Sequence, residues 1–198
     1  MIRSTAPTPP AFARLLRTGA LVAVLAGTAA LAAAPGIAAT AAPARKLPPA
    51  PANAAAPEWR GWNDGLKQAS VTNRPVIVDV YTDWCGWCRR MDHDVYSKSE
   101  VADYLKKKFV TIRLNAESKD ATAYEGHDYT ARDLSTQRFR VSGYPTTIFL
   151  RANGDHMANV PGYVPADRFL LLLRYVAEGY ADRNVPFAEF EKTAAQQN

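Results

Sequence analysis

A six-residue apolar run, residues 76–81, leads directly toward the only two cysteines of the chain, Cys85 and Cys88. The run is rich in β-branched residues and is interrupted by a single acid, Asp79, which is typical of a strand buried on both faces. Cysteines three positions apart suit the first turn of a helix, where unpaired N–H groups and the helix dipole stabilise a thiolate. The pattern therefore predicts a buried strand, a turn, and a helix whose first turn holds a disulfide that opens and closes.

Other uses of the cysteine pair are structural or metal binding. A structural framework normally needs four or more cysteines, and a bridge across two residues removes almost no entropy from the unfolded chain. Met91 and His93 follow Cys88 on the same helix, so a copper or zinc site is an alternative. The solvated face of a polar helix is the favoured interpretation of both residues. We also predict that His127 and His156 lie on the surface, and we predict no metal and no cofactor.

The N-terminal residues predict an export signal followed by a linker. Three arginines precede an uncharged, Ala-rich stretch at 18–34, and the Ile-Ala-Ala pattern at 37–39 suits cleavage. An uncleaved membrane anchor is the alternative, although the stretch falls short of the ~20 strongly apolar residues that a span prefers. We therefore predict a signal peptide at 1–39, a disordered Ala/Pro-rich linker at 40–57 and one folded domain at 58–198. The expected location is the periplasm or another exported compartment, with membrane attachment only if the signal stays uncleaved.

The net charge gives no argument for nucleic-acid binding. The chain has 24 Lys and Arg against 19 Asp and Glu, which is a formal charge of +5. The predicted signal holds three arginines and no acid, so the remaining residues carry only +2. Because the folded region shows no basic cluster, we expect no nucleic-acid partner.

Periodicity and turn signals predict the order helix, strand, helix, strand, helix, strand, strand, helix. Ser99 is the expected N-cap of one helical segment, Asn153-Gly154 is the expected hairpin turn, and the last segment is expected to dock or to fray. The predicted helices cover residues 58–70, 85–96, 97–107, 133–140, 165–180 and 186–195, and the predicted strands cover 76–81, 109–115, 146–150 and a fourth strand ending near 160.

Three segments of the chain together resemble the thioredoxin family, over roughly residues 72–178. They are the strand and cysteine turn at 78–88, the strand at 111–115, and Val-Ser-Gly-Tyr-Pro-Thr at 141–146, which resembles the family's cis-proline loop. The resemblance implies a thioredoxin-like α/β fold, with a central mixed sheet flanked by helices. It also makes the N-terminal residues an extension and 116–130 a short insertion before the cis-proline loop. Gly-Trp between the cysteines departs from the family's Gly-Pro.

The residues suggest a division of labour at the site. Cys85, at the helix start, is expected to be exposed and to attack, whereas Cys88 is expected to be shielded and to resolve the mixed disulfide. An acid inside an apolar strand should have a raised pKa, so Asp79 is expected to exchange protons with Cys88, as the resemblance also implies. A solvated acid at the strand end is the alternative. Pro145, if cis, would present the Tyr144 backbone to an extended substrate segment, with a trans proline as the alternative.

Aromatic residues next to the cysteines predict a substrate-binding rim. Trp84, Gly86 and Trp87 are expected to form it, with Trp87 exposed to partners and Trp84 either packed or in contact with substrate. Within the insertion, Tyr124 and Tyr129 are the hypothesis for a partner-binding surface. An ordinary polar loop is favoured over a cation-binding patch for its acidic residues.

Together these patterns predict an exported thiol–disulfide oxidoreductase that exchanges dithiol and disulfide with protein substrates and with a redox partner protein. Trp87 stands between the cysteines without the histidine that favours the thiolate in strong oxidants, so a reductant or exchange protein is favoured. The alternatives are a periplasmic copper chaperone using Cys85, Cys88 and His93, and a binding module without redox turnover. The patterns predict no particular oligomeric state.

Overall fold

The computed structural model describes residues 56–195, which include almost all of the predicted domain. The predicted signal peptide at 1–39 and most of the predicted linker at 40–57 lie outside the described residues. None of the helices within 56–195 combines the length and the apolar character that a membrane crossing requires.

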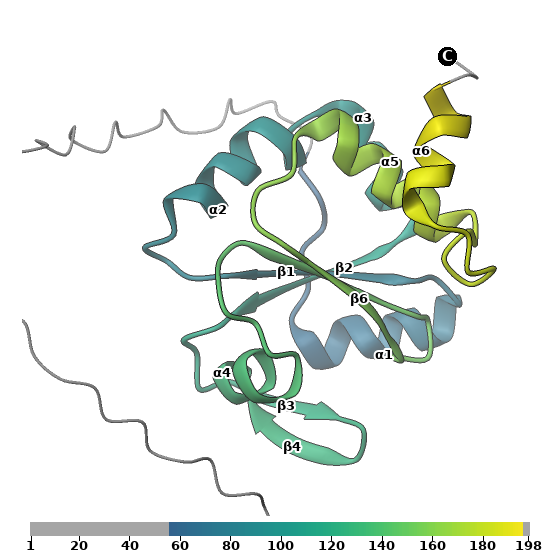
Figure 1. The fold of residues 1–198 in the computed structure, drawn as a ribbon. Coiled ribbons are helices and arrows are strands. Elements are labelled where there is room, and N and C mark those ends of the chain that lie inside the picture. The colour runs from purple at the N-terminus through teal and green to yellow at the C-terminus, as the bar shows by residue number, and fades with distance from the viewer. Residues whose placement is uncertain (1–55, 196–198) are drawn as a thin grey trace, which may run out of the picture. The chain divides into compact units, whose positions relative to one another are not determined.

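Six α-helices, two π-helical turns and six strands make up the described part of the chain (Figure 1). The π-helical turns continue α2 and α4. In chain order the elements are α1 (Trp62–Thr72), β1 (Val76–Tyr81), α2 (Gly86–Met91), the first π turn (Asp92–Tyr96), α3 (Ser99–Lys108), β2 (Val110–Asn115), β3 (Ala121–Tyr124), β4 (His127–Thr130), α4 (Ala131–Asp133), the second π turn (Leu134–Arg138), β5 (Thr146–Leu150), β6 (His156–Pro161), α5 (Ala166–Ala177) and α6 (Phe187–Ala195).

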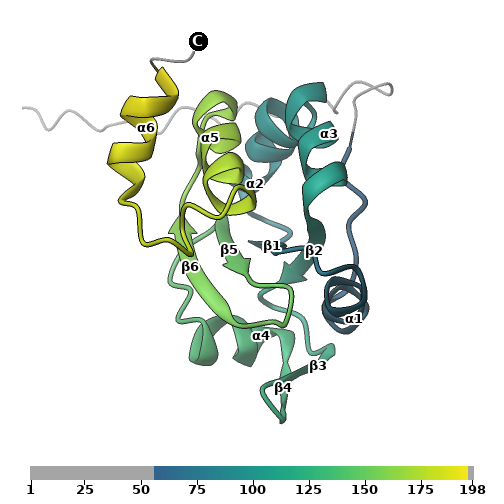
Figure 2. The ribbon, with the colours of Figure 1, turned by 90° about the vertical axis from the view of Figure 1, so that its right-hand side faces the viewer.

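The central sheet has the strand order β2-β1-β5-β6 and is mixed. β1 runs parallel to β2 and antiparallel to β5, and β6 is antiparallel to β5. Helices α2, α3 and α5 cover one face, while α1, α4 and the β3–β4 hairpin lie on the other (Figures 1 and 2). The mixed sheet flanked by helices confirms the predicted fold class. The strands predicted at 76–81 and 146–150 have the predicted bounds.

Alternation along β1 divides the core into two halves. Val76, Val78 and Val80 face α1 and α4, whereas Ile77 faces the helices α2, α3 and α5. Asp79 has the same parity as Ile77, so its carboxyl is directed toward the helix that carries the cysteines. One strand thus supplies an apolar core on one side and an acid behind the disulfide on the other.

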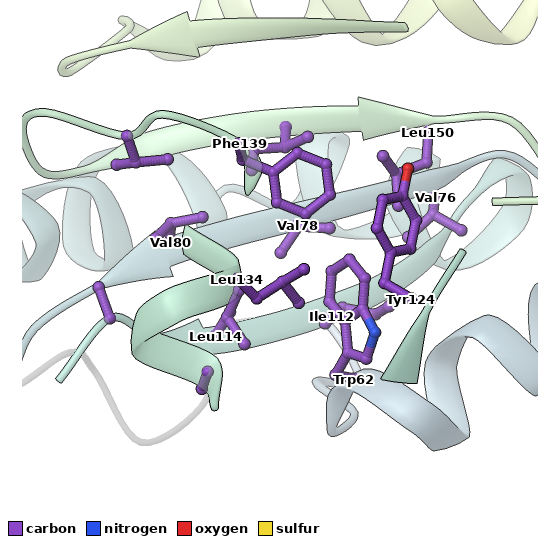
Figure 3. Packing of buried hydrophobic residues seen from close by; sticks show 14 of the residues in the cluster. Trp62, Val76, Val78, Val80, Ile112, Leu114, Tyr124, Leu134, Phe139 and Leu150 are labelled. Carbon is purple, nitrogen blue, oxygen red and sulfur yellow. The ribbon is translucent and has the colours of Figure 1, made fainter. Parts of the chain in front are cut away.

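The segment predicted as a polar insertion, residues 116–130, contains the β3–β4 hairpin, and Tyr124 of this hairpin is part of the hydrophobic core. Tyr124 packs with Trp62 and Phe139, at ring-centroid distances of 5.5 and 5.1 Å (Figure 3). The Trp62 indole donates a hydrogen bond to the Ala123 carbonyl at 2.9 Å, and Asn63 pairs with the backbone of β3. The hypothesis that Tyr124 forms a partner-binding surface is therefore wrong, because the side chain is buried against α1.

Two predicted details of the helices are also wrong. The first helix begins at Trp62 rather than at residue 58, because the Arg60 backbone pairs with the free edge of β2 through Thr111 and Arg113. Lys98, not Ser99, occupies the N-cap of α3, and no side chain caps that end. The final segment docks as α6, with Phe190 buried, which settles the alternative between docking and fraying.

Candidate active site

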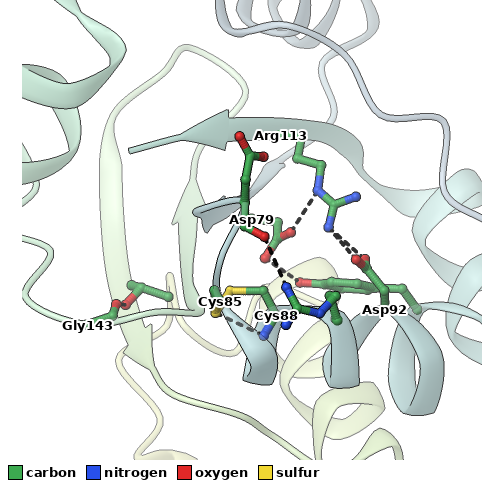
Figure 4. The surroundings of a disulfide bond; sticks show 10 residues. Asp79, Cys85, Cys88, Asp92, Arg113 and Gly143 are labelled. Atoms are coloured by element: carbon green, nitrogen blue, oxygen red, sulfur yellow. Dashed lines mark hydrogen bonds and ion pairs between the residues drawn. A yellow bond between two sulfur atoms is a disulfide. The ribbon is translucent and has the colours of Figure 1, made fainter. Parts of the chain in front are cut away.

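Cys85 and Cys88 form a disulfide at the start of α2 (Figure 4). Their Cα atoms are 5.3 Å apart. Cys85 is the N-cap of the helix, and its sulfur accepts a hydrogen bond from the Cys88 N–H at 3.0 Å. An N-cap sulfur that accepts a backbone N–H has its negative charge stabilised when the disulfide opens. The predicted placement of the pair at the first turn of a helix is confirmed.

The two cysteines do not differ in exposure in this disulfide form. Each residue is 3% exposed, so the expectation of an exposed Cys85 and a shielded Cys88 is wrong here. In this disulfide the Cys85 sulfur lies against the first turn of α2, where it accepts the hydrogen bond from the Cys88 N–H. Any difference between the two sulfurs must therefore come from their surroundings.

Asp79 lies on the Cys88 side of the sheet and is 1% exposed, which excludes the alternative of a solvated acid. Burial raises its pKa to about 6, although the Arg113 guanidinium acts in the opposite direction. Arg113 Nε donates to Asp79 Oδ2 at 3.2 Å, and the Tyr96 hydroxyl donates to Oδ1 at 3.4 Å. This environment agrees with the predicted rise in the pKa of Asp79. A carboxyl group with a pKa of about 6 can take up and release protons near neutral pH.

Arg113 joins Asp79 to a second acid that the sequence patterns did not single out. Its Nη2 donates to both carboxylate oxygens of Asp92 at 2.7 Å (Figure 4). The guanidinium also lies over the rings of Tyr81 and Trp59, at 4.7 and 5.2 Å from their centroids. Arg113 is the register partner of Asp79 in the parallel β1–β2 pair. A basic residue within an otherwise apolar strand was the sequence signal that could have identified Arg113 as part of the site.

The loop before β5 contains the predicted cis proline. The Tyr144–Pro145 peptide bond is cis, and the alternative of a trans proline is wrong. Thr146 Oγ1 donates to the Gly143 carbonyl at 2.8 Å, and the Pro145 carbonyl accepts from the Gly162 N–H at 2.8 Å. Figure 4 shows Gly143 on the Cys85 side of the disulfide. Within residues 56–195, the Tyr144 N–H and C=O make no hydrogen bond.

Two exposed tryptophans next to the cysteines in the chain, Trp84 and Trp87, are the aromatic members of the predicted rim. Trp84 is 65% exposed and Trp87 is 57% exposed, as expected for Trp87. The Trp84 indole donates to Glu117 at 2.9 Å and meets the Tyr144 ring edge-to-face at 6.0 Å. Trp87 pairs with Tyr163 at 5.7 Å. Glu117 and Tyr163 were not predicted as parts of this rim, because both come from loops distant in sequence.

The histidines do not gather around the cysteines. The His93 ring pairs with Asp94 at 2.8 Å, and His127 and His156 are exposed as predicted. Across residues 56–195, no three side chains of His, Cys, Asp or Glu are placed to hold a metal ion together.

A disulfide at a helix N-terminus, backed by a buried acid and faced by a cis-proline loop, defines a redox site of the thioredoxin type. Residues 62–177 match the family model described as a thioredoxin-like domain. The chain therefore belongs to the thioredoxin-like family, and with its Cys85–Cys88 disulfide it is a thiol–disulfide oxidoreductase of that family. The predicted family and enzyme class are confirmed.

Two curated relatives are similar over about half of the chain or more. The chain is 34% identical over 113 residues to the thiol:disulfide interchange protein DsbD of Ralstonia nicotianae, a match that covers 57% of this chain and 17% of that protein. It is 27% identical over 122 residues to the chloroplastic thioredoxin-like protein HCF164 of Arabidopsis thaliana, covering 62% of this chain and 41% of that protein. The chain thus spans less than half the length of either relative.

Solved structures support the same fold. A thioredoxin from Thermus thermophilus superimposes with a TM-score of 0.51 and 26% identity, covering 63% of this chain and 89% of that chain. A thioredoxin-fold protein from Helicobacter pylori has a TM-score of 0.52 at 18% identity, covering 68% of this chain and 83% of that chain. At that identity the second match supports the fold alone.

Proposed function

We propose that the chain is an exported thiol–disulfide exchange protein that acts on protein disulfides, with Cys85 as the attacking residue and Cys88 as the resolving residue. The observation that carries this assignment is the hydrogen bond from the Cys88 N–H to the Cys85 sulfur at the N-terminus of α2. It stabilises a thiolate on Cys85, and the thiolate is the form that attacks a disulfide.

Reduction of a substrate takes two steps. The Cys85 thiolate attacks one sulfur of the substrate disulfide, which forms a mixed disulfide and releases the other substrate sulfur as a thiolate. The Cys88 thiol then loses its proton, and its sulfur attacks Cys85 to form the Cys85–Cys88 disulfide. This step releases the second substrate sulfur, so the substrate gains two electrons. A dithiol partner protein returns the pair to the reduced state by the reverse exchange.

Asp79 is the proposed acceptor of the Cys88 proton. Its carboxyl is buried on the face of the sheet that α2 covers, and its pKa is raised to about 6 by burial. A carboxyl group with this pKa is mostly ionised at neutral pH, and it is basic enough to accept a proton from a thiol. The released substrate thiolate is the eventual destination of the proton.

The aromatic rim and the cis-proline loop form the proposed substrate site. Trp84 and Trp87, which are next to the cysteines in the chain, offer exposed apolar rings. The unpaired backbone of Tyr144, next to Pro145, is available for strand-like pairing with an extended substrate segment. A Cβ atom on Gly86 would meet only the Arg89 guanidinium, at 3.8 Å, so this position leaves room for the approaching chain.

The proposed direction of electron flow is toward the substrate, in the periplasm or another exported compartment reached through a cleaved signal at residues 1–39. Trp87 between the cysteines provides no cation that would favour the thiolate as strongly as histidine does. The relative from Ralstonia nicotianae is named as a thiol:disulfide interchange protein, which agrees with exchange chemistry. A reduction potential of about −270 mV would support a reductant, whereas a value of about −120 mV would reverse the assigned direction.

A pair of matched serine variants tests the assignment of the two cysteines. The reduced Cys88→Ser variant should accumulate a mixed disulfide with an insulin substrate, because Cys85 attacks and nothing resolves the product. Cys85→Ser should accumulate none. Equal trapping by both variants would contradict the division of roles. Stoichiometric copper(I) binding by a wild type that does not reduce insulin would favour the copper chaperone instead.

A further inference from the structure

We propose that Asp92 is a positioning residue that sets the proton affinity of Asp79 through the Arg113 guanidinium, which the two carboxylates share. The inference rests on the proposed function only in so far as Asp79 receives the Cys88 proton. Asp92 itself lies on the first π turn, one helical turn beyond Cys88.

Hydrogen-bond geometry shows that Arg113 is divided unequally between the two acids. Its Nη2 lies 2.7 Å from both oxygens of Asp92, whereas its Nε lies 3.2 Å from Asp79 Oδ2. Charge-assisted hydrogen bonds are shorter and stronger than neutral ones, and both contacts of Nη2 with Asp92 have the short distance typical of that class. Arg113 thus makes its shorter contacts with the partly exposed Asp92 and its longer contact with the buried Asp79, so one cation serves two carboxylates.

Aromatic rings hold the guanidinium in this shared position. The Arg113 head group lies over the rings of Tyr81 and Trp59, at 4.7 and 5.2 Å. Trp59 is itself packed edge-to-face on Tyr96, at 5.0 Å. Packing on these surfaces restricts the head group, so it cannot leave Asp92 to pair with Asp79 alone without losing favourable contacts.

Charge balance gives the consequence. With both carboxylates ionised, the cluster of Asp79, Arg113 and Asp92 carries a net charge of −1, and protonation of Asp79 makes it neutral. Without the charge of Asp92, ionised Asp79 would form a neutral pair with Arg113, and protonation of Asp79 would leave the partly buried guanidinium without a charged partner. A nearby like charge favours the neutral form of a carboxyl group, so Asp92 promotes proton uptake by Asp79.

Few other groups face Asp79 from the elements packed against it. Tyr96, at the end of the π turn, donates a hydrogen bond to it, and Thr147 is its uncharged register partner on β5. Arg113 and Asp92 are the principal charges acting on it among the described residues. Because the π turn carries both Asp92 and Tyr96, the helix that presents Cys88 also controls the acid behind it.

The test is the titration of the Asp79 carboxyl carbon, followed by NMR in the oxidised protein. Asp92→Asn should lower the midpoint by about one pH unit relative to wild type, since a like charge is removed. Asp92→Ala should do the same, and Asp92→Glu should retain the wild-type midpoint. Asp94→Asn is the matched control, because Asp94 lies on the same π turn but pairs with Arg90 and His93. An unchanged midpoint in folded Asp92→Asn or Asp92→Ala, or an equal shift in Asp94→Asn, would overturn the proposal.

A second measurement separates this inference from the proposed function. The acid limb of the insulin-reduction rate against pH should move to lower pH in Asp92→Asn, by the same interval as the NMR midpoint. If wild type reduces insulin and neither the limb nor the midpoint moves, the inference fails while the proposed function stands. If the midpoint moves but wild type reduces no disulfide, the proposed function fails and the coupling of the two carboxylates stands.

Discussion

Replacing Asp79 by Asn should stabilise the oxidised protein at neutral and alkaline pH. The carboxyl is buried, and its pKa rises from 3.8 to about 6 in the folded state because burial disfavours its charge. The folded protein therefore holds the Asp79 proton more tightly than the unfolded chain does. The contribution of Asp79 to the unfolding free energy is most favourable below the pKa that this group has in the unfolded chain. This contribution falls as the pH rises from about 4 to about 6. Asparagine resembles the protonated carboxyl in shape but never ionises.

The size of the effect follows from the shift. A difference of about two pKa units, at 1.36 kcal/mol each, makes ionised Asp79 cost about 3 kcal/mol of unfolding free energy. Asp79→Asn should therefore be more stable than wild type by about 3 kcal/mol at pH 7.5. At pH 4 the advantage should fall below about 1 kcal/mol, since the carboxyl is then protonated in the folded protein.

Guanidinium unfolding of the oxidised proteins, monitored by tryptophan fluorescence at both pH values, measures this difference. Asp94→Asn is the control, and its effect on the unfolding free energy at pH 7.5 should have the opposite sign. Hydrogen bonding to His93 lowers the pKa of Asp94, so its charge contributes stability above the unfolded pKa that is lost as the pH falls. An Asp79→Asn variant that is no more stable than wild type at pH 7.5, or whose advantage does not grow with pH, would refute the reasoning. The same variant should reduce insulin more slowly because Cys88 loses its proton acceptor.

Three further substitutions test the rim and the core. Gly65→Ala should lower the Tm, because a Cβ atom would lie 2.3 Å from Ile112 Cγ1 and overpacking of about 1–3 kcal/mol outweighs a helix gain of up to about 1 kcal/mol; an unchanged Tm would contradict this. Glu117→Ala should raise the KM for insulin severalfold, because the Trp84 indole loses its hydrogen-bond acceptor. Glu117→Gln should keep a KM near that of wild type, and Glu117→Ala should still reduce a small disulfide reagent at the wild-type rate. Equal loss of activity with insulin and with the small reagent would argue against a role of the rim in substrate binding. Tyr124→Phe should cost about 1 kcal/mol in denaturant unfolding, because the Gly154 carbonyl loses the hydroxyl that donates to it, and should leave insulin reduction unchanged.

The sequence allowed prediction of those parts of the site that are local in the chain. A buried strand, a cysteine pair and a helix start are consecutive, so their geometry follows from short-range rules, as does the Asn153-Gly154 turn. The hairpin at 121–130 was missed because its strands are only four residues long and the second of them, His127–Thr130, is mostly polar. Its stability comes from Tyr124 packing on Trp62, a contact across more than sixty positions of sequence that no local pattern contains.

Arg113, the charged partner of Asp79, could not be predicted either, because the contact depends on strand pairing and not on the local sequence. Asp79 and Arg113 are neighbours only because β1 and β2 pair in parallel with that register, and a slip of one residue would turn the guanidinium to the opposite face. The same register places Asp92 within reach of Arg113 from the helix above. Strand pairing thus fixes the buried charges behind the disulfide, while loops from β1, β2 and β5 supply Trp84, Glu117 and Tyr144 in front of it. Substitutions behind the disulfide should therefore alter pH dependence, whereas substitutions in front should alter the choice of protein substrate.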